Sequence, residues 1–332
     1  IAFADCPYLY HQLHPRFFAL YRPAQTPETV PRIFVSRTLL AQMKPFYSVI
    51  LPIYNAAETL AETLDSLLAQ DYPSFEICAV NDGSSDGSRA ILEAYREQHP
   101  ALSWKIVDRA NGGLGAARNA GVAVAEGDFC ALLDADDRWH PNKLSRCAQY
   151  LERERDTALL YHPVRAFGGD RKARNRGIYS VVEIRELLLK GNPLVPSAVI
   201  IARDLLREEA FSEDLRFHGA EDLELWMRLL HGGHPFHLWP EVLADYRRSG
   251  GMSSNLEEHL QHVFAVLRTG YERGYYWQSD LEAARQRKYY EAGRMCQKRG
   301  DHHEANRYFS AADAKSMKLL GLRFLNGLGI RW

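Results

Sequence analysis

The stretch SVILPIYNAAETLAETLDSLLAQDYPSFEICAVNDGSSDGS, residues 48–88, decides the fold class of this chain. It opens with an apolar run, continues with leucines spaced three and four residues apart, and returns to a second apolar run. Short apolar runs are typical of buried strands, whereas that leucine spacing forms one face of a helix. The stretch therefore predicts a strand at 47–54, a helix at 57–70 and a second strand at 75–81.

The same alternation continues downstream of this unit. Helices are expected at 86–99 and 113–127, and strands at 103–109 and 128–134. Strand–helix alternation at this spacing predicts a doubly wound, mostly parallel sheet with right-handed crossovers. Ligands of such sheets bind outside the carboxyl ends of the strands, so polar residues at those ends are the first candidates for a site.

The second half of the chain has a mixed pattern. Residues 158–167 and 195–202 are each expected to form a strand, and 220–231 an amphipathic helix. The segment 235–248 predicts two short strands around Pro240. This half of the chain therefore adds further strands and one long helix to the alternating first half.

These patterns divide the chain into three expected regions. Residues 1–46 are rich in proline and aromatic residues without periodicity and form an N-terminal extension, and 47–250 form the α/β domain. Residues 251–332 form an all-helical C-terminal region, in which 289–314 resemble a single tetratricopeptide-like hairpin. The basic, apolar tail at 318–332 has two interpretations: an interfacial helix on an anionic membrane, or a last helix docked on the hairpin.

Composition narrows the class of protein. The chain has 332 residues, 46% of them hydrophobic and 25% charged, which is typical of a globular protein. Its net charge is -1, so the chain as a whole has no positive charge to attract nucleic acid. Lys and Arg nevertheless outnumber acids by eleven to four from residue 285 onward. Five scattered cysteines predict a reducing, cytoplasmic location, with peripheral contact at the inner face of the membrane if the tail binds there. No uncharged stretch reaches the roughly 18–20 residues of a membrane-spanning helix.

Three acidic side chains end the fourth expected strand, in CALLDADDRW at residues 130–139. They are Asp134, Asp136 and Asp137, and Asp82 ends another strand at the same edge. Such a cluster suits a hard cation such as Mg²⁺ or Mn²⁺, which binds through few carboxylates plus the phosphates of a substrate. A glycosidase pair needs two separated carboxylates, which this cluster does not supply. A plain helix cap remains open for Asp137.

Four segments, in this order along the chain, resemble glycosyltransferase family 2. They are SVILPIYNAAETLAETLDSLLAQDYPSFEICAVNDGSSDGS, NGGLGAARNAG, GDFCALLDADDRWHPNKL and GAEDLELWMRL. The resemblance covers about residues 47–250 and implies the GT-A fold, an α/β architecture. It further implies a metal-dependent, inverting, hexosyltransferase-type enzyme that uses Mn²⁺ or Mg²⁺. The donor would be a nucleotide diphosphate sugar, with UDP expected, and the acceptor a hydroxyl of a surface glycan, a lipid-linked oligosaccharide or a protein glycoconjugate.

The resemblance also implies roles for residues on the donor side. Pro52 and Tyr54 would flank the nucleotide base, and Asp82 would accept hydrogen bonds from it, which favours uridine. Asn111 and Arg118 lie in the segment that closes over the nucleotide. The planar fork of Arg118 suits a phosphate or carboxylate oxygen, and a salt bridge to a strand-end aspartate is its structural alternative.

Among the strand-end acids, the resemblance assigns Asp134 to the ribose side and Asp136 to the metal. Asp137 is expected to serve as a cap or a supporting group.

In GAEDLELW, the resemblance makes Asp222 the general base and Glu221 the residue that orients the acceptor or the base. The alternative role of both acids is structural: negative side chains in the first turn stabilise a helix by complementing its dipole. Many relatives have a histidine after the YR at the end of this domain, where this chain has Ser249. A third protein ligand to the metal is therefore not expected, and Arg247 or Arg248 is a candidate contact to the diphosphate.

Two other classes of function remain open from the sequence. A sugar nucleotidyltransferase uses a similar sheet and metal but attacks phosphorus, and it has little need of the acids at the start of the 220–231 helix. A non-catalytic, transferase-like scaffold with a helical partner module is the second. The presence of Asp82, Asp136 and Asp222 together favours the enzyme over the scaffold.

Overall fold

The computed structural model describes residues 44–312, apart from 155, 169–173, 177–178 and 249–254. The chain divides at residue 44, into Ile1–Lys44 and Pro45–Trp332, and every element described below belongs to the second unit. The expected N-terminal extension, up to residue 43, and the tail at 318–332 lie outside the described residues.

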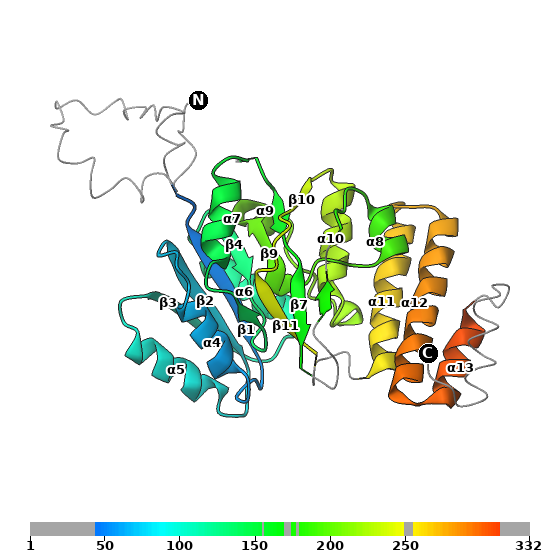
Figure 1. The fold of residues 1–332 in the computed structure, drawn as a ribbon, viewed down its shortest axis with the longest axis horizontal. Helices are drawn as coiled ribbons and strands as arrows, with labels where there is room; N and C mark the ends of the chain where they lie inside the picture. The colour runs from blue at the N-terminus through cyan, green and yellow to red at the C-terminus, as the bar shows by residue number, and fades with distance from the viewer. Residues whose placement is uncertain (1–43, 155, 169–173, 177–178, 249–254, 313–332) are drawn as a thin grey trace. The chain divides into compact units, whose positions relative to one another are not determined.

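A seven-stranded sheet forms the centre of the second unit (Figure 1), in the order β10-β6-β9-β4-β1-β2-β3. Its strands are β1 (Tyr47–Ile53), β2 (Phe75–Asp82), β3 (Ser103–Arg109), β4 (Phe129–Leu132), β6 (Leu159–Tyr161), β9 (Val199–Ala202) and β10 (Phe236–Leu238). Neighbouring strands are parallel except at β9, which runs antiparallel to both β4 and β6. The predicted mostly parallel sheet is therefore confirmed.

Helices cover both faces of this sheet, as a doubly wound fold requires. They are α4 (Leu60–Leu68), α5 (Ser88–Gln98), α6 (Leu114–Val124), α7 (Lys143–Leu151), α9 (Arg203–Glu208) and α10 (Glu221–His231), whereas α8 (Ile184–Lys190) packs against α10 and the later helix α12 (Gln278–Arg299). Alternate residues of β1 point to opposite faces: Val49 packs in the same cluster as Leu64 of α4, while Ile50 packs in the cluster of α6. The continuous apolar run of β1 thus reflects burial on two sides.

The expected strand at 158–167 is divided in the structure. Its first part is β6, whereas its second part is β7 (Val164–Phe167) in a separate four-stranded sheet. Pro163 lies between them, and proline has no N–H to continue a strand ladder. The second sheet also contains β5 (Arg138–Trp139), β8 (Arg174–Arg176) and β11 (Ala244–Arg247). A proline likewise shortens the expected strand at 195–202, because the 3₁₀ turn Pro196–Ala198 occupies its first half.

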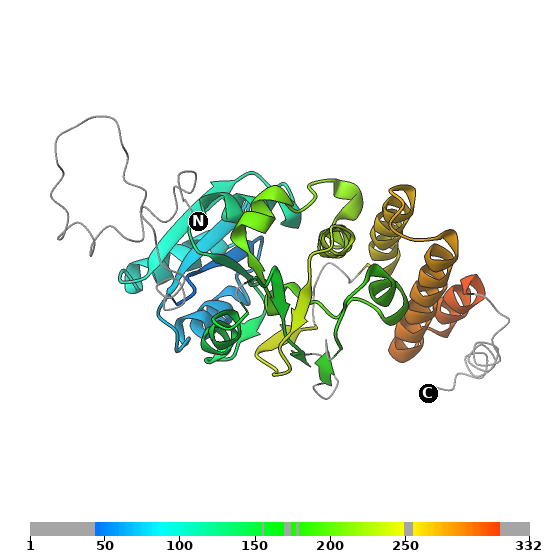
Figure 2. The same ribbon diagram turned by 90° about the horizontal axis from the view of Figure 1, so that it is seen from above.

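Helices complete the described chain after residue 255, as predicted. They are α11 (Leu256–Glu272), α12 (Gln278–Arg299) and α13 (His302–Ala311). Gly300, with a left-handed φ of 88°, ends α12, and α12 and α13 pack as an antiparallel hairpin in which Phe309 lies against Gly293 (Figure 2). No helix among the described residues is long and apolar enough to cross a membrane.

Candidate active site

A cleft of about 2060 Å³ opens at the carboxyl ends of β1, β2 and β4. The strand ends form one wall, and α11 and α12 contribute the other. Most of the candidate residues line it: Pro52, Tyr54, Asp82, Asn111, Asp134, Asp136 and Asp222. Arg118 and Glu221 are buried. The structure therefore brings the predicted residues together, in and beneath one cavity.

The end of β1 carries the proposed base-stacking residue. Tyr54 is 53% exposed in the cleft, while Pro52 is buried at the edge of the sheet. Asn55 fixes the turn after them, because its side-chain oxygen accepts a 2.9 Å hydrogen bond from the Ser85 N–H and its own N–H donates to Ser84 Oγ at 3.1 Å. The loops after β1 and β2 are thereby joined, and the Tyr54 ring remains open to a ligand.

Asp82 ends β2 with its carboxylate directed at the loop between β3 and α6. Its oxygens accept hydrogen bonds from the backbone N–H groups of Gly112 at 3.1 Å and Gly113 at 3.0 Å. Arg109 Nε lies 3.3 Å from the same carboxylate. Asn111, which is exposed, accepts from the Gly113 N–H at 3.1 Å. Asp82 therefore holds the loop that carries Asn111 in addition to lining the cleft.

Arg118 is an arginine 1% exposed that joins two of the predicted acids. One terminal guanidinium nitrogen donates to Asp134 Oδ1 and the other to Glu221 Oε1, each at 2.8 Å. The guanidinium also lies 5.2 Å from the ring centre of Phe211. Although burial opposes it, the two carboxylates raise the pKa of Arg118 above its ordinary value. The structural alternative for this residue, a salt bridge to a strand-end aspartate, is present.

The carboxylate of Asp136 lines the cleft beside Asp134. Burial and the neighbouring Asp134 charge raise the pKa of Asp136 to about 6. Its backbone carbonyl accepts a 2.8 Å hydrogen bond from Arg247 Nε, and no side chain in the described ranges pairs with its carboxylate. Asp136 thus presents free acceptor oxygens to the cavity.

Asp137 supports this segment and does not cap a helix. Its buried carboxylate accepts a 2.8 Å hydrogen bond from the backbone N–H of Arg247, on β11. The following helix α7 begins after Asn142 without a side-chain cap. Arg247 also forms an ion pair with Glu62, so its guanidinium joins the acidic segment to α4.

Asp222 lies in the first turn of α10, at the edge of the cleft. Its Oδ2 accepts a 3.2 Å hydrogen bond from the side-chain amide of Asn192. Burial first, and then the charge of Glu221, raise the pKa of Asp222 to about 7, while Arg118 opposes the shift. A carboxyl that ionises near neutral pH is suited to general base catalysis.

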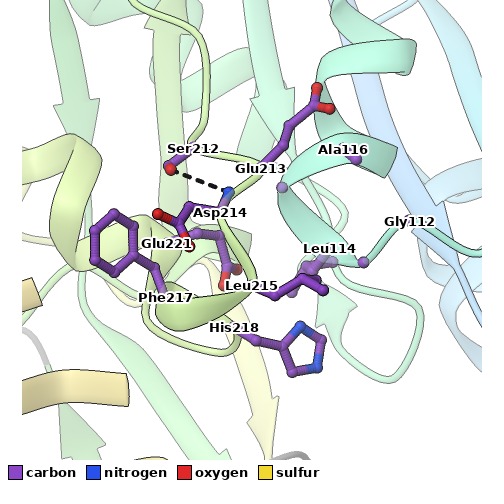
Figure 3. Close-up of a pocket in the computed structure, with 12 residues that line it drawn as sticks. Gly112, Leu114, Ala116, Ser212, Glu213, Asp214, Leu215, Phe217, His218 and Glu221 are labelled. Carbon is purple, nitrogen blue, oxygen red and sulfur yellow. Dashed lines mark hydrogen bonds between the residues drawn. The ribbon is translucent and has the colours of Figure 1, made fainter. Parts of the chain in front are cut away.

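Glu221 faces away from the main cleft. It lines a hollow of about 10 Å³, roughly one water in size, between the start of α6 and the residue 212–218 loop (Figure 3). One of its oxygens pairs with Arg118, and the other has no hydrogen-bond partner among the described residues. The structure therefore places Glu221 against Arg118, next to the candidate base Asp222 and outside the main cleft.

The donor atoms at Asp136 fit a metal that is shared with a substrate. No three His, Cys, Asp or Glu side chains converge as a metal site within the described part of the chain. Mg²⁺ and Mn²⁺ are hard cations that take carboxylate oxygens, and Mg²⁺ commonly binds through one or two of them, with waters and substrate phosphates completing its shell. The unpaired carboxylate of Asp136 in an open cleft matches that mode of binding.

Sequence reasoning missed several residues that shape the site. Asn192 contacts Asp222, and Ser197 accepts a 3.0 Å hydrogen bond from the backbone N–H of Asp134. Their local sequences, GNP and PSA, signal only turns. Four basic residues of α12 also line the cleft: Arg287, Lys288, Arg294 and Lys298. The excess of basic residues after position 285 was a signal for them, but it did not indicate which surface they would occupy.

Comparison with known proteins places these observations in context. Residues 48–208 match the sequence model described as Glycosyl transferase family 2. The chain is 30% identical over 225 residues to the amylovoran biosynthesis glycosyltransferase AmsB of Erwinia amylovora, covering 60% of this chain and 69% of AmsB. It is 29% identical over 231 residues to TuaG of Bacillus subtilis (strain 168), named for teichuronic acid biosynthesis, covering 69% of this chain and 90% of TuaG.

Two solved structures show the same fold. A TarS fragment of S. aureus in complex with UDP-GlcNAc has a TM-score of 0.59 at 21% identity and covers 86% of each chain. The mannosyltransferase PcManGT from Pyrobaculum calidifontis, in complex with GDP-Man and Mn²⁺, has a TM-score of 0.59 at 19% identity. That match covers 87% of this chain and 81% of PcManGT.

Proposed function

Because the chain belongs to glycosyl transferase family 2, we propose that it moves a sugar from a nucleotide diphosphate sugar to an acceptor hydroxyl by a single inverting displacement. One observation carries this proposal: a short series of charged contacts links the candidate base to the strand-end acids. Asp222 is adjacent to Glu221, which pairs with Arg118. Arg118 in turn pairs with Asp134, two residues before Asp136. The base and the donor site are thereby held in one rigid arrangement.

The donor is assigned to the strand-end wall of the cleft. Tyr54 is exposed there for stacking on a base, with Pro52 beside it, and the Asp82 carboxylate and the Asn111 loop border the same space. Asp134 would lie by the ribose. A carboxylate acceptor at Asp82 favours a base with an imide N–H, so UDP is the proposed nucleotide. The TarS complex with UDP-GlcNAc supports a uridine donor, whereas the PcManGT complex contains GDP-Man.

Asp136 would hold a divalent cation, Mn²⁺ or Mg²⁺, together with the donor diphosphate. A cation there would neutralise charge on the departing diphosphate. The protein itself holds Asp136 in place through its backbone: Arg247 Nε donates to the Asp136 carbonyl at 2.8 Å. The complex of PcManGT with GDP-Man and Mn²⁺ supports the use of a divalent metal.

The acceptor reacts on the Asp222 side. Its hydroxyl oxygen attacks the anomeric carbon from the face opposite the diphosphate, the bond from that carbon to the diphosphate oxygen breaks, and the configuration inverts. Asp222 takes the hydroxyl proton. Asn192 holds Asp222 Oδ2, which leaves the carboxylate oriented by a fixed amide. General base catalysis of this kind contributes roughly 10²–10⁴-fold to the rate.

The acceptor is proposed to be a glycan. AmsB is named for amylovoran biosynthesis and TuaG for teichuronic acid biosynthesis, so two relatives are named for the synthesis of polysaccharides. Surface glycan synthesis is the setting that these names favour.

Release of nucleotide diphosphate from a panel of nucleotide sugars, with Mn²⁺ present, tests the function. We expect turnover with UDP-sugars that is lost in Asp136→Ala and falls about 10²–10⁴-fold in Asp222→Asn. Glu58→Gln removes an exposed carboxylate of the same cleft and should leave turnover unchanged, which excludes a general charge effect.

Other outcomes of this assay would contradict the proposal. Pyrophosphate release from a sugar phosphate and a nucleoside triphosphate would indicate a nucleotidyltransferase. Donor binding by calorimetry without turnover, across acceptors and metals, would indicate a scaffold. The stereochemistry of the product, read by NMR from the anomeric coupling, tests inversion directly.

A further inference from the structure

Lys143, the first residue of α7, has a fully buried side chain. Burial of a lysine is rare because the amine loses its hydration, so the partner that it meets inside the protein is informative. The Lys143 amine donates a 2.7 Å hydrogen bond to the backbone carbonyl of Ser197 and lies 3.7 Å from the ring centre of Trp139. Burial lowers the pKa of Lys143 to about 7, and both the ammonium and the neutral amine can donate this hydrogen bond. The fold therefore directs a buried amine at a single backbone carbonyl.

The same carbonyl is held by a second buried donor. Trp139 Nε1 donates to the Ser197 oxygen at 2.8 Å, so both lone pairs of this carbonyl are used. Ser197 is itself fully buried, in the 3₁₀ turn Pro196–Ala198 that leads into β9. Two donors from outside the turn thus fix a residue that a three-residue turn would hold only weakly.

The hydroxyl of Ser197 in turn holds the start of the acidic segment. Its Oγ accepts a 3.0 Å hydrogen bond from the backbone N–H of Asp134. One residue earlier, the Leu133 N–H still donates to the Ile50 carbonyl of β1, at 3.0 Å. The chain therefore leaves the sheet at Asp134, and Ser197 accepts the first N–H that β1 does not.

Other side chains hold the carbonyls of the rest of this segment. The donors are Thr59 Oγ1 to Ala135 at 2.9 Å, Arg247 Nε to Asp136 at 2.8 Å and Thr63 Oγ1 to Asp137 at 2.8 Å. Each residue from 134 to 137 is thus tied through its backbone, and the Ser197 contact is the one at the point of departure from β4. The Asp136 carboxylate is presented by a segment whose path the protein fixes in advance.

We infer that Lys143 is a positioning residue for the divalent metal: through Ser197 it fixes where the segment Asp134–Asp136 leaves β4, and thereby the direction of the Asp136 carboxylate. This inference rests on the proposed role of Asp136 as the metal ligand. A cation that takes few ligands from the protein depends strongly on how each of them is oriented. Removing a group that orients a metal ligand typically weakens metal binding roughly 10–100-fold.

Mn²⁺ binding at saturating UDP, read from the electron paramagnetic resonance signal of free Mn²⁺, tests this role. Lys143→Met keeps an unbranched side chain without the donor, and Ser197→Ala removes the hydroxyl. Each should raise the dissociation constant of Mn²⁺ about tenfold, at the lower end of the range for such groups. The double variant should show no more than the larger single effect, because both changes act through one contact.

A change elsewhere on α7 provides the control. Cys147 is also fully buried, one turn after Lys143, and Cys147→Ala should leave Mn²⁺ binding unchanged. An equal rise in Cys147→Ala, fully additive effects of Lys143→Met and Ser197→Ala, or wild-type binding in Lys143→Met would each overturn the inference.

Hydrogen exchange reports the position of the segment without metal or nucleotide. Exchange of the Asp134 amide, followed by mass spectrometry of overlapping peptides, should be about fivefold faster in Lys143→Met, as for the loss of one supporting hydrogen bond. Unchanged exchange would overturn the inference. Should Lys143→Met fail to fold, Trp139→Phe removes the other donor to the same carbonyl and is judged by the same two measurements.

Asp136→Ala separates this inference from the proposed function. Loss of Mn²⁺ binding in Asp136→Ala, together with the rise in Lys143→Met, supports both. Wild-type binding in Asp136→Ala would overturn the metal assignment itself and the inference with it. Loss in Asp136→Ala with wild-type binding in Lys143→Met would overturn the role of Lys143 alone.

Discussion

At the scale of single residues, the fold shifts the ionisation of Asp222, the candidate base. Burial and the charge of Glu221 raise its pKa, while Arg118 and the Leu223 N–H lower it. The balance is a pKa of about 7 in a carboxyl whose ordinary value is near 4. Replacing Glu221 or Arg118 should therefore move the pH range in which Asp222 is ionised.

The pH dependence of kcat/KM should report this ionisation. Asp222 can accept a proton only when it is deprotonated, so kcat/KM should fall about tenfold for each pH unit below 7 and level off above it. Measuring nucleotide release from pH 5.5 to 8.5 tests this. A rate that is flat across pH 7, or an unchanged acidic limb in Asp222→Asn, would exclude Asp222 as the base.

The same shift predicts a pH-dependent gain of stability in Asp222→Asn. A carboxyl with a raised pKa binds its proton more tightly in the folded state, so its contribution to stability is lost as pH rises from about 4 to 7. The free energy of unfolding of Asp222→Asn, relative to the wild type, should increase between pH 5 and pH 8. Urea titrations at several pH values measure it, and a difference that stays constant between pH 5 and pH 8 would contradict the prediction.

The candidate site was predictable where side chains follow directly from strand ends. Asp82, Asp134 and Asp136 could be placed together because parallel strands bring their carboxyl ends to one edge. The contact of Asn192 with Asp222 could not be predicted, because a sequence typical of a turn does not indicate which distant residue the turn will contact. The pairing of Arg118 with Glu221, across 103 residues of sequence, likewise depends on how α6 and α10 pack.

At the scale of elements, the junction between α6 and β4 is among the tightest backbone contacts in the sheet. A Cβ on Gly127 would lie 2.5 Å from the Ser48 nitrogen and 2.7 Å from the Phe46 oxygen, both backbone atoms that cannot rotate away. The Gly127 N–H also donates to Ser48 Oγ at 2.8 Å. This contact sets how β4, and with it the Asp134–Asp136 segment, aligns beside β1.

Gly127→Ala should therefore destabilise the fold. Overpacking of this kind costs about 1–3 kcal/mol, which urea denaturation can measure. Gly87→Ala is the matched control, because its Cβ would meet nothing closer than 3.8 Å and its φ of -71° is ordinary. We expect that change to alter stability by less than about 0.5 kcal/mol. Equal effects of the two substitutions would show that the contact at Gly127 is relaxed.

The elements of the first half could be predicted almost completely, and those of the second only in outline. Periodicity identified β1, α4 and β2 because each buries an apolar face of regular spacing. The run at 158–167 is equally apolar on both sides of Pro163, so its pattern could not show that the two halves enter different sheets. That choice is made by tertiary packing, which local sequence does not record.

At the scale of the whole molecule, the C-terminal helices share the core of the sheet. Val263, Val266 and Leu267 of α11 and Ala284 of α12 belong to the same buried cluster as Ile50 of β1 and Trp226 of α10. An ion pair of 3.0 Å also joins Arg185 of α8 to Asp280 of α12. The helical wall of the cleft is thus tied to the wall that carries the acids.

Leu267→Ala should weaken the entire unit and not the helices alone. Leu267 is 2% exposed, and such a truncation costs about 2–5 kcal/mol. Thermal unfolding followed by far-ultraviolet circular dichroism and by tryptophan fluorescence should give one shared, lowered transition. Two separate transitions, with only the circular dichroism signal shifted, would show that α11–α13 fold independently.

The division of the cleft between two stretches of chain matters for building hybrid enzymes. The family match ends at residue 208, before the candidate base and before α12, so the two walls of the cavity could in principle be inherited from different parents. A graft of α11–α13 alone would set foreign side chains against Trp226 of α10. A crossover point just after Glu208 keeps that contact within one parent, but separates Glu221 from its own Arg118. Chimeras joined at that point should remain active only when the parent that supplies the second part has an acidic residue at the position of Glu221.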